Sequence, residues 1–105
     1  MEISMVRGIC QRLEEYSIKY PQEVLFVRLE ADGHFDEVAI FKGFSSSLMH
    51  PTAFDPDMPV IPDDAKILEV DRAKAPYNPK VPEYIERNIT WAQFKKKMAK
   101  AGIKI

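Results

Sequence analysis

Apolar residues recur at spacings of three and four along residues 4–20, which is the pattern of an amphipathic helix. Pro21 ends this pattern, because a residue that precedes proline is disfavoured in helical geometry. The same spacing returns near the carboxyl end of the chain, where Thr90 and Gln93 fit a capping box. We therefore expect a second helix over residues 90–101.

Between these helices, three runs of residues have the pattern of β-strands. Residues 23–30 and 35–44 are rich in branched and aromatic side chains, and residues 23–30 alternate with a period of two. Asp32 and Gly33 between them predict a hairpin turn, because such a turn needs a positive φ that glycine adopts without steric cost. Residues 65–72 are the third expected strand. Its expected buried residues are Ile67, Leu68 and Val70.

Two stretches, 45–64 and 73–89, have no sustained period and hold every proline except Pro21. Their apolar content is too high for a disordered linker, so we expect ordered loops stiffened by proline. Phe54 and Val60 are expected to pack the first loop against the sheet. The residues expected to pack the second loop are Tyr77, Val81, Tyr84 and Ile85.

These elements predict one α+β domain over residues 1–105. A small, mainly antiparallel sheet, made of the hairpin and the third strand, packs against an N-terminal and a C-terminal helix, with long proline-rich ordered loops. The expected core consists of Ile9, Leu13, Leu25, Val27, Val38, Ile40, Ile67, Trp91, Phe94 and Met98.

Composition excludes several classes of protein. The 105 residues are 46% hydrophobic and 30% charged, which is typical of a globular domain. No apolar run approaches the ~18–20 residues that span a membrane, and no secretory signal is evident at the N-terminus. The single cysteine, Cys10, excludes an internal disulfide and is expected to be a buried thiol. We expect a soluble cytoplasmic protein.

Charge is balanced over the whole chain but not along it. Residues 1–71 hold six Lys or Arg and fourteen Asp or Glu, a balance of −8. Residues 72–105 hold nine and two, a balance of +7. Such asymmetry is typical of a basic face that meets nucleic acid or an acidic protein, or of ion pairing within one domain. We favour the internal pairing.

The expected C-terminal helix carries the strongest candidate for nucleic-acid binding. Its lysines could contact phosphates, although a solvated lysine face is the commoner meaning of such a cluster. Trp91, which could stack on a base, belongs to the apolar stripe and is expected in the core. The candidate phosphate-binding residues are Arg87, Lys95, Lys96, Lys97 and Lys100.

Two other groups of side chains have a chemistry to consider. Acidic residues in the first loop, together with His50, could bind a hard cation, but their spacing does not fit an EF-hand loop. The three serines at 45–47 follow a strand without the pattern of a nucleophile elbow or a phosphate loop. We therefore expect no metal, no cofactor and no catalytic residue. The acidic candidates were Asp55, Asp57, Asp63 and Asp64.

Several distinctive strings lie in the proline-rich stretches and at their borders. They are FKGFSSSLMHPTAFDPD at 41–57, PVIP at 59–62, DR at 71–72, APYNP at 75–79, YIE at 84–86 and TW at 90–91. With these strings, residues 22–100 resemble a small, functionally uncharacterised protein family of cyanobacteria and plant plastids. The resemblance implies a compartment, the cytoplasm or the plastid stroma, and a photosynthetic organism. It implies no activity or cofactor.

The first hypothesis for function is a non-enzymatic protein-binding or assembly module with an unidentified protein partner. Stiff loops lose little entropy on docking, which suits a recognition surface. The alternative that the loops only complete a thin core stays open. A nucleic-acid-associated protein that uses the lysine-rich helix is the second hypothesis. The candidate protein-binding residues are Phe54, Asp55, Tyr77, Asn78 and Tyr84.

Overall fold

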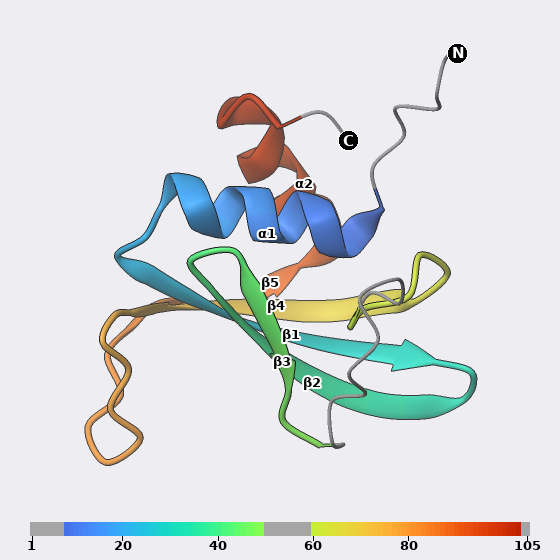
Figure 1. The fold of residues 1–105 in the computed structure, drawn as a ribbon, viewed down its shortest axis with the longest axis horizontal. Coiled ribbons are helices and arrows are strands. Elements are labelled where there is room, and N and C mark those ends of the chain that lie inside the picture. Colours follow the sequence, from blue (N-terminus) through green and yellow to red (C-terminus); the bar gives the residue numbers. More distant parts are fainter. Residues whose placement is uncertain (1–7, 50–59, 104–105) are drawn as a thin grey trace.

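The computed structural model describes residues 8–49 and 60–103, which form two helices and a five-stranded antiparallel sheet. The helices lie on one side of the sheet (Figure 1), and its strand order is β3-β2-β1-β4-β5. The predicted α+β class is confirmed. The elements are α1 (Ile9–Lys19), β1 (Glu23–Ala31), β2 (His34–Phe41), β3 (Phe44–Ser47), β4 (Lys66–Lys74), β5 (Tyr84–Thr90) and α2 (Trp91–Lys100).

The main core lies between the helices and one face of the sheet. Alternation along β1 directs Leu25, Val27 and Leu29 to this face, where each is buried. The rings of Tyr16 on α1 and Phe94 on α2 meet there, with centroids 5.0 Å apart. Eight of the ten predicted core residues are buried, and the other two, Ile9 and Trp91, are half-buried and pack against the core.

The predicted hairpin is confirmed at its turn and wrong at its far end. Asp32 and Gly33 both have positive φ, as the tight turn requires. Lys42 and Gly43 form a second turn of this kind, with φ of 49° and 87°, so β2 ends at Phe41, three residues before the predicted end of the strand. Phe44–Ser47 therefore pairs with β2 as the edge strand β3, where we expected the end of a strand and the start of a loop.

The prediction of a loop over 73–89 is wrong at both ends. The strand β4 continues to Lys74, and Tyr84–Thr90 forms the other edge strand, β5. Two shifts of register between β4 and β5 interrupt the alternation that would have shown β5 in the sequence. The loop proper is limited to residues 75–83, and Val81 within it is exposed rather than packed, as is Ile85 on β5.

The predicted burial of Leu68 is wrong because β4 contains a β-bulge. Val70 lies opposite Val27, and Ile67 lies opposite Leu29, so β4 contains one residue more than β1 over this interval. The extra residue returns both Val70 and Ile67 to the helix-covered face, where they are buried, while Leu68 is exposed.

The helix ends follow from local hydrogen bonds. The Thr90 hydroxyl accepts a hydrogen bond from the Gln93 N–H at 3.2 Å, and the Gln93 side chain accepts one from the Thr90 N–H. This capping box is the predicted one, and α2 starts directly after it. Helix α1 begins after Gly8 rather than at the predicted residue 4, and residues 4–7 lie outside the described residues.

Candidate functional site

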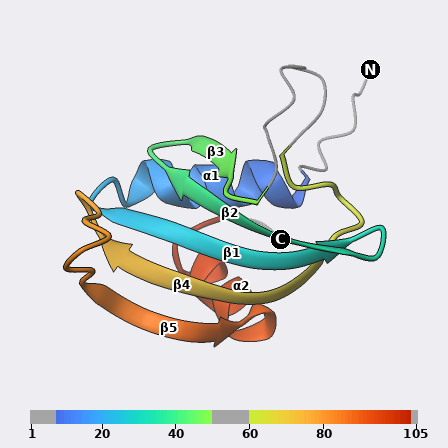
Figure 2. The same cartoon turned by 90° about the horizontal axis from the view of Figure 1, so that it is seen from below.

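No helix among the described residues covers the second face of the sheet (Figure 2). This face carries a pocket. The positions of β1 that alternate with the core residues, Val24, Phe26 and Arg28, point to this face. They form the floor of the pocket together with Ala39 and other residues of β2. The volume of the pocket is about 580 Å³, within the range of sites that hold a drug-sized molecule or a few side chains.

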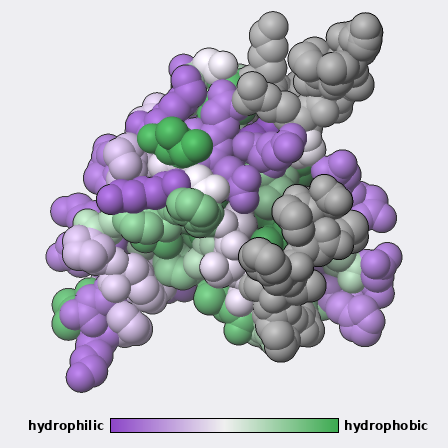
Figure 3. All heavy atoms as spheres, viewed as in Figure 1, coloured by the Kyte–Doolittle hydropathy of each residue, from purple (hydrophilic) through white to green (hydrophobic). Residues whose placement is uncertain are grey.

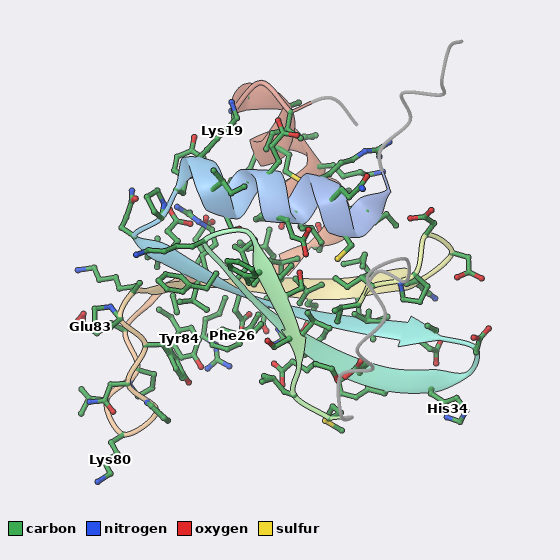
Figure 4. The ribbon with its side chains drawn as sticks, viewed as in Figure 1. Lys19, Phe26, His34, Lys80, Glu83 and Tyr84 are labelled. Carbon is green, nitrogen blue, oxygen red and sulfur yellow. The ribbon has the colours of Figure 1, made fainter. Side chains whose placement is uncertain are left out.

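One end of this pocket is apolar and aromatic. Val24 and Phe26 are buried there in a second, smaller hydrophobic cluster, and the half-buried rings of Tyr77 and Tyr84 pack on it. The Phe26 and Tyr77 rings meet edge to face, with centroids 4.8 Å apart. The hydroxyls of Tyr77 and Tyr84 lie 3.5 Å apart. Figure 4 shows Tyr84 beside Phe26 on the side of the sheet away from the helices.

The wall of this apolar end is the loop 75–83, which projects beyond the sheet on the side opposite the helices (Figure 1). Backbone hydrogen bonds fix it at its base, where Lys74 N–H donates to Glu83 O and Ala75 N–H donates to Gln22 O, both at 2.8 Å. Near its tip, the Asn78 side chain accepts a hydrogen bond from Lys80 N–H at 3.0 Å. Asn78 thus shapes the loop.

The other end of the pocket is charged, and Asp71 is held there by a set of hydrogen bonds. Asp71 is buried, and two nitrogens of Arg28 donate to its carboxylate at 2.9 and 3.1 Å. The N–H of Asn88 donates to the same carboxylate at 2.8 Å. Burial alone would raise the pKa of Asp71, but these hydrogen bonds and the charge of Arg28 hold it below its usual value. Glu69 completes the set, accepting from Arg28 at 3.1 Å.

Arg87 reaches the pocket because β5 bulges beside Asp71. Glu86 lies opposite Arg72 and Ile89 opposite Val70, so two residues, Arg87 and Asn88, face the single residue Asp71. The Arg87 guanidinium lies over the Tyr84 ring, 4.2 Å from its centroid, and its Nε is 3.4 Å from Asp71 Oδ2. This arginine is one of the predicted phosphate-binding candidates; it lies on β5, before the lysine-rich helix, beside the aromatic rings.

The lysines of α2 are partly engaged within the molecule. Lys97 pairs with Glu86 at 2.9 Å, which lowers the pKa of that carboxyl, and Glu86 also pairs with Arg72. Lys95 lies over the Trp91 ring, and Lys96 and Lys100 are exposed. Arg72 also binds Glu23, so ion pairs join the acidic and basic parts of the chain, as the favoured interpretation predicts.

Of the side chains considered for nucleophilic chemistry, those of Cys10, Ser45 and Ser47 lie on the core side, whereas Ser46 pairs with Ala39 of the pocket face. Cys10 is buried, as expected, and burial raises the pKa of its thiol, which opposes formation of a thiolate. The Ser45 hydroxyl donates to Glu14 at 2.7 Å, and the Ser47 hydroxyl donates to Asp36 at 2.8 Å. These serines stabilise the structure around β3.

Among residues 8–49 and 60–103, no group of three or more His, Cys, Asp and Glu is placed to hold a metal ion. Asp63 lies against Gly8, the N-cap of α1, where its charge favours the helix dipole, and Asp64 is exposed. The other candidates in this loop, His50, Phe54, Asp55 and Asp57, lie outside the described residues.

A separate apolar feature lies at the C-terminal end of α1. Ile18 and Phe44 are both exposed, and Ile18 lies against Gly43 in the turn before β3. Figure 3 shows apolar side chains in this region among polar ones. Single exposed apolar residues are common on protein surfaces, so the candidate site is the pocket on the other face.

Fold and site together define a small α+β domain in which helices cover one face of an antiparallel sheet and the other face holds a pocket. The model of a family described as Domain of unknown function (DUF7734) matches residues 10–98, so the chain belongs to that family. No curated protein and no solved structure matches the chain. Within the described ranges, no helix is long and apolar enough to cross a membrane.

Proposed function

We propose that this domain is a non-enzymatic module that binds a segment of another protein in the pocket between the open sheet face and the loop 75–83. The observation that carries the proposal is the aromatic end of the pocket, formed by Phe26, Tyr77 and Tyr84. Aromatic side chains bring a large contact area at a small entropic cost, which is why they dominate binding surfaces.

The shape of the pocket favours a protein segment over an enclosed small molecule. A small-molecule site usually buries most of its ligand, whereas this pocket lies on a sheet face and is open on one side. Leu48, at its border, has 53% of its surface exposed. An apolar side chain anchored on an extended partner could fill the aromatic end, while the rest of the partner covers the exposed border.

The loop supports this proposal through its fixed shape. Pro76 and Tyr77 line the pocket, and the hydrogen bonds at the base of the loop hold both residues against the sheet. A wall that is ordered before binding loses less entropy when a partner docks. Tyr77 and Tyr84 are therefore retained as binding residues, and Asn78 as a residue that positions the loop. Phe54 and Asp55 stay predictions.

Quantitative co-purification from a lysate of a photosynthetic organism tests the proposal. We expect the unmodified domain to enrich a protein that Tyr77→Ala no longer enriches. The matched control is Val81→Ala, on the same loop but outside the pocket and 65% exposed, which should retain the protein. Circular dichroism checks that both variants are folded. Equal recovery with Tyr77→Ala and Val81→Ala contradicts the proposal.

Nucleic-acid binding through α2 stays the alternative. Lys96 and Lys100 are its exposed candidates, whereas Lys95 and Lys97 are engaged with Trp91 and Glu86. A titration of RNA and duplex DNA against salt decides between the hypotheses, because affinity through phosphate contacts falls steeply with salt. Tight, salt-dependent binding that Lys96→Gln and Lys100→Gln abolish would favour the alternative.

We also propose, on the resemblance described above, that the protein acts in the cytoplasm of a cyanobacterium or in a plastid stroma. Family members encoded mainly outside photosynthetic organisms would contradict this setting.

A further inference from the structure

The charged end of the pocket contains two arginines with different environments. Arg28 donates from Nε and both terminal nitrogens to Asp71, Glu69 and Asn88, and its side chain is 18% exposed. Asp71 in turn accepts three hydrogen bonds and is buried. These groups satisfy one another, so neither Arg28 nor Asp71 is left to contact a partner.

Arg87 differs from Arg28 in every one of these respects. Its side chain is 55% exposed, and its ion-pair contact is a long one, from Nε to Asp71 at 3.4 Å. No hydrogen bond from its terminal nitrogens is found among residues 8–49 and 60–103. The Tyr84 ring beneath it and Asp71 beside it hold the guanidinium in place, which prepares its planar fork for a carboxylate.

The acidic side chains near Arg87 either pair with Arg28 or point away from Tyr84. Glu69 and Glu37 lie 3.1 and 3.5 Å from Arg28, which engages both. Glu83 is the last residue of the loop and lies on its outer side, away from Tyr84 (Figure 4). Exposed Lys80 lies at the loop tip (Figure 4) and adds positive charge to this wall. An acidic group therefore fits the rim beside Tyr84.

We infer, on the basis of the proposed function, that the partner segment carries an aromatic or branched apolar side chain next to an Asp or Glu. The apolar side chain enters the space beside Phe26, Tyr77 and Tyr84. The carboxylate binds the terminal nitrogens of Arg87. Specificity then comes from the spacing of an apolar anchor and one negative charge, since the aromatic end alone would accept any apolar side chain of suitable size.

Selection from a random peptide display library tests the inference without knowledge of the natural partner. We expect the selected peptides to share an apolar residue with Asp or Glu one or two positions away. A synthetic peptide of that consensus is then titrated against purified variants. Arg87→Gln keeps much of the side chain over Tyr84 but removes the charge, and should weaken binding by about tenfold to a hundredfold.

Matched controls separate Arg87 from general charge effects. Lys96→Gln removes one exposed positive charge from α2, on the other side of the sheet, and should leave affinity nearly unchanged. Lys80→Gln removes the charge at the loop tip and should weaken binding much less than Arg87→Gln, because Lys80 lies farther from Tyr84 (Figure 4). Increasing salt should weaken the unmodified domain more than Arg87→Gln, because only the former keeps the ion pair. Circular dichroism of each variant establishes that it is folded.

The outcomes distinguish this inference from the proposed function. Peptides whose binding Tyr77→Ala abolishes but Arg87→Gln leaves intact would overturn the inference and keep the proposed function. Enrichment of basic peptides that depend on Glu37 would also overturn it. If no peptide binds the unmodified domain better than Tyr77→Ala, both the inference and the proposed function fail.

Discussion

Replacing Asp71 by asparagine should test how strongly the buried carboxylate stabilises the open face. The substitution keeps the size of the side chain and one carbonyl oxygen, which can still accept from the Asn88 N–H. It removes the charge that faces Arg28 at 2.9 Å and Arg87 at 3.4 Å. The new amide N–H groups would in addition face donors of Arg28.

The expected loss of unfolding free energy is about 2–4 kcal/mol. Removing one partner of a buried ion pair costs roughly 3–5 kcal/mol, because the other charge is left uncompensated. Arg28 is 18% exposed and retains Glu69, so the cost at this site should lie in the lower part of that range or just below it. Since small domains are stable by only about 5–15 kcal/mol, such a loss is easily measured.

Urea unfolding followed by circular dichroism gives the free energies of Asp71→Asn and of a matched control, Glu69→Gln. Glu69 contacts the same arginine but is 44% exposed, so Glu69→Gln should lower the unfolding free energy by less than about 1 kcal/mol.

The dependence of stability on pH adds a second measurement. Because the folded pKa of Asp71 is below its unfolded value, its stabilisation is present above the unfolded pKa and is lost as pH falls through the folded one.

The unmodified protein should therefore lose stability below about pH 4 more steeply than Asp71→Asn, which has no carboxyl to protonate at this position. A free energy for Asp71→Asn within about 0.5 kcal/mol of the unmodified protein would refute the reasoning, since that is the range of an unimportant surface change. So would equal losses in Asp71→Asn and Glu69→Gln.

Three further substitutions or treatments test other parts of the structure. Thr90→Ala should lower the unfolding free energy by about 1 kcal/mol in urea, while Thr90→Ser, which keeps the capping hydroxyl, should cost less; equal losses would contradict the capping role. Gly43→Ala should lower the thermal stability more than Gly33→Ala. Both positions have positive φ, but only at Gly43 would the new Cβ lie 3.0 Å from Ile18. Thermal unfolding compares the two variants, and the reverse order would count against this contact. The thiol of Cys10 should react slowly with an aromatic disulfide reagent in buffer and rapidly in urea, since burial raises its pKa and blocks access; similar rates followed by absorbance would show that it is not buried in solution.

The fold was predictable wherever one local rule acted alone. The Asp32-Gly33 turn, the stripe of α2 and its capping box each follow from neighbouring residues, and each is found in the structure. Strand β5 was missed because two register shifts remove the alternation on which such a prediction depends. The exposed position of Leu68 has the same origin, since the bulge in β4 arises from pairing with β1 and leaves no local signal.

The candidate site was predictable only in part. Tyr77 and Tyr84 stood out as aromatic residues in a proline-rich stretch, and the structure brings them together. Phe26 and Arg28 were missed because the predicted core took only Leu25 and Val27 from this strand. The apolar pair Val24 and Phe26 on the second face was a usable signal, since apolar residues there indicate that something packs on them, and Tyr77 of the loop does so.

The two margins of the sheet oppose edge-to-edge pairing with further copies of the chain. An unpaired, regular strand is a template on which further chains add, and this risk grows with its length and flatness. Here β3 offers only four residues, and the bulges of β5 break the regular row of N–H and C=O groups. Growth by strand addition is therefore hindered at both margins.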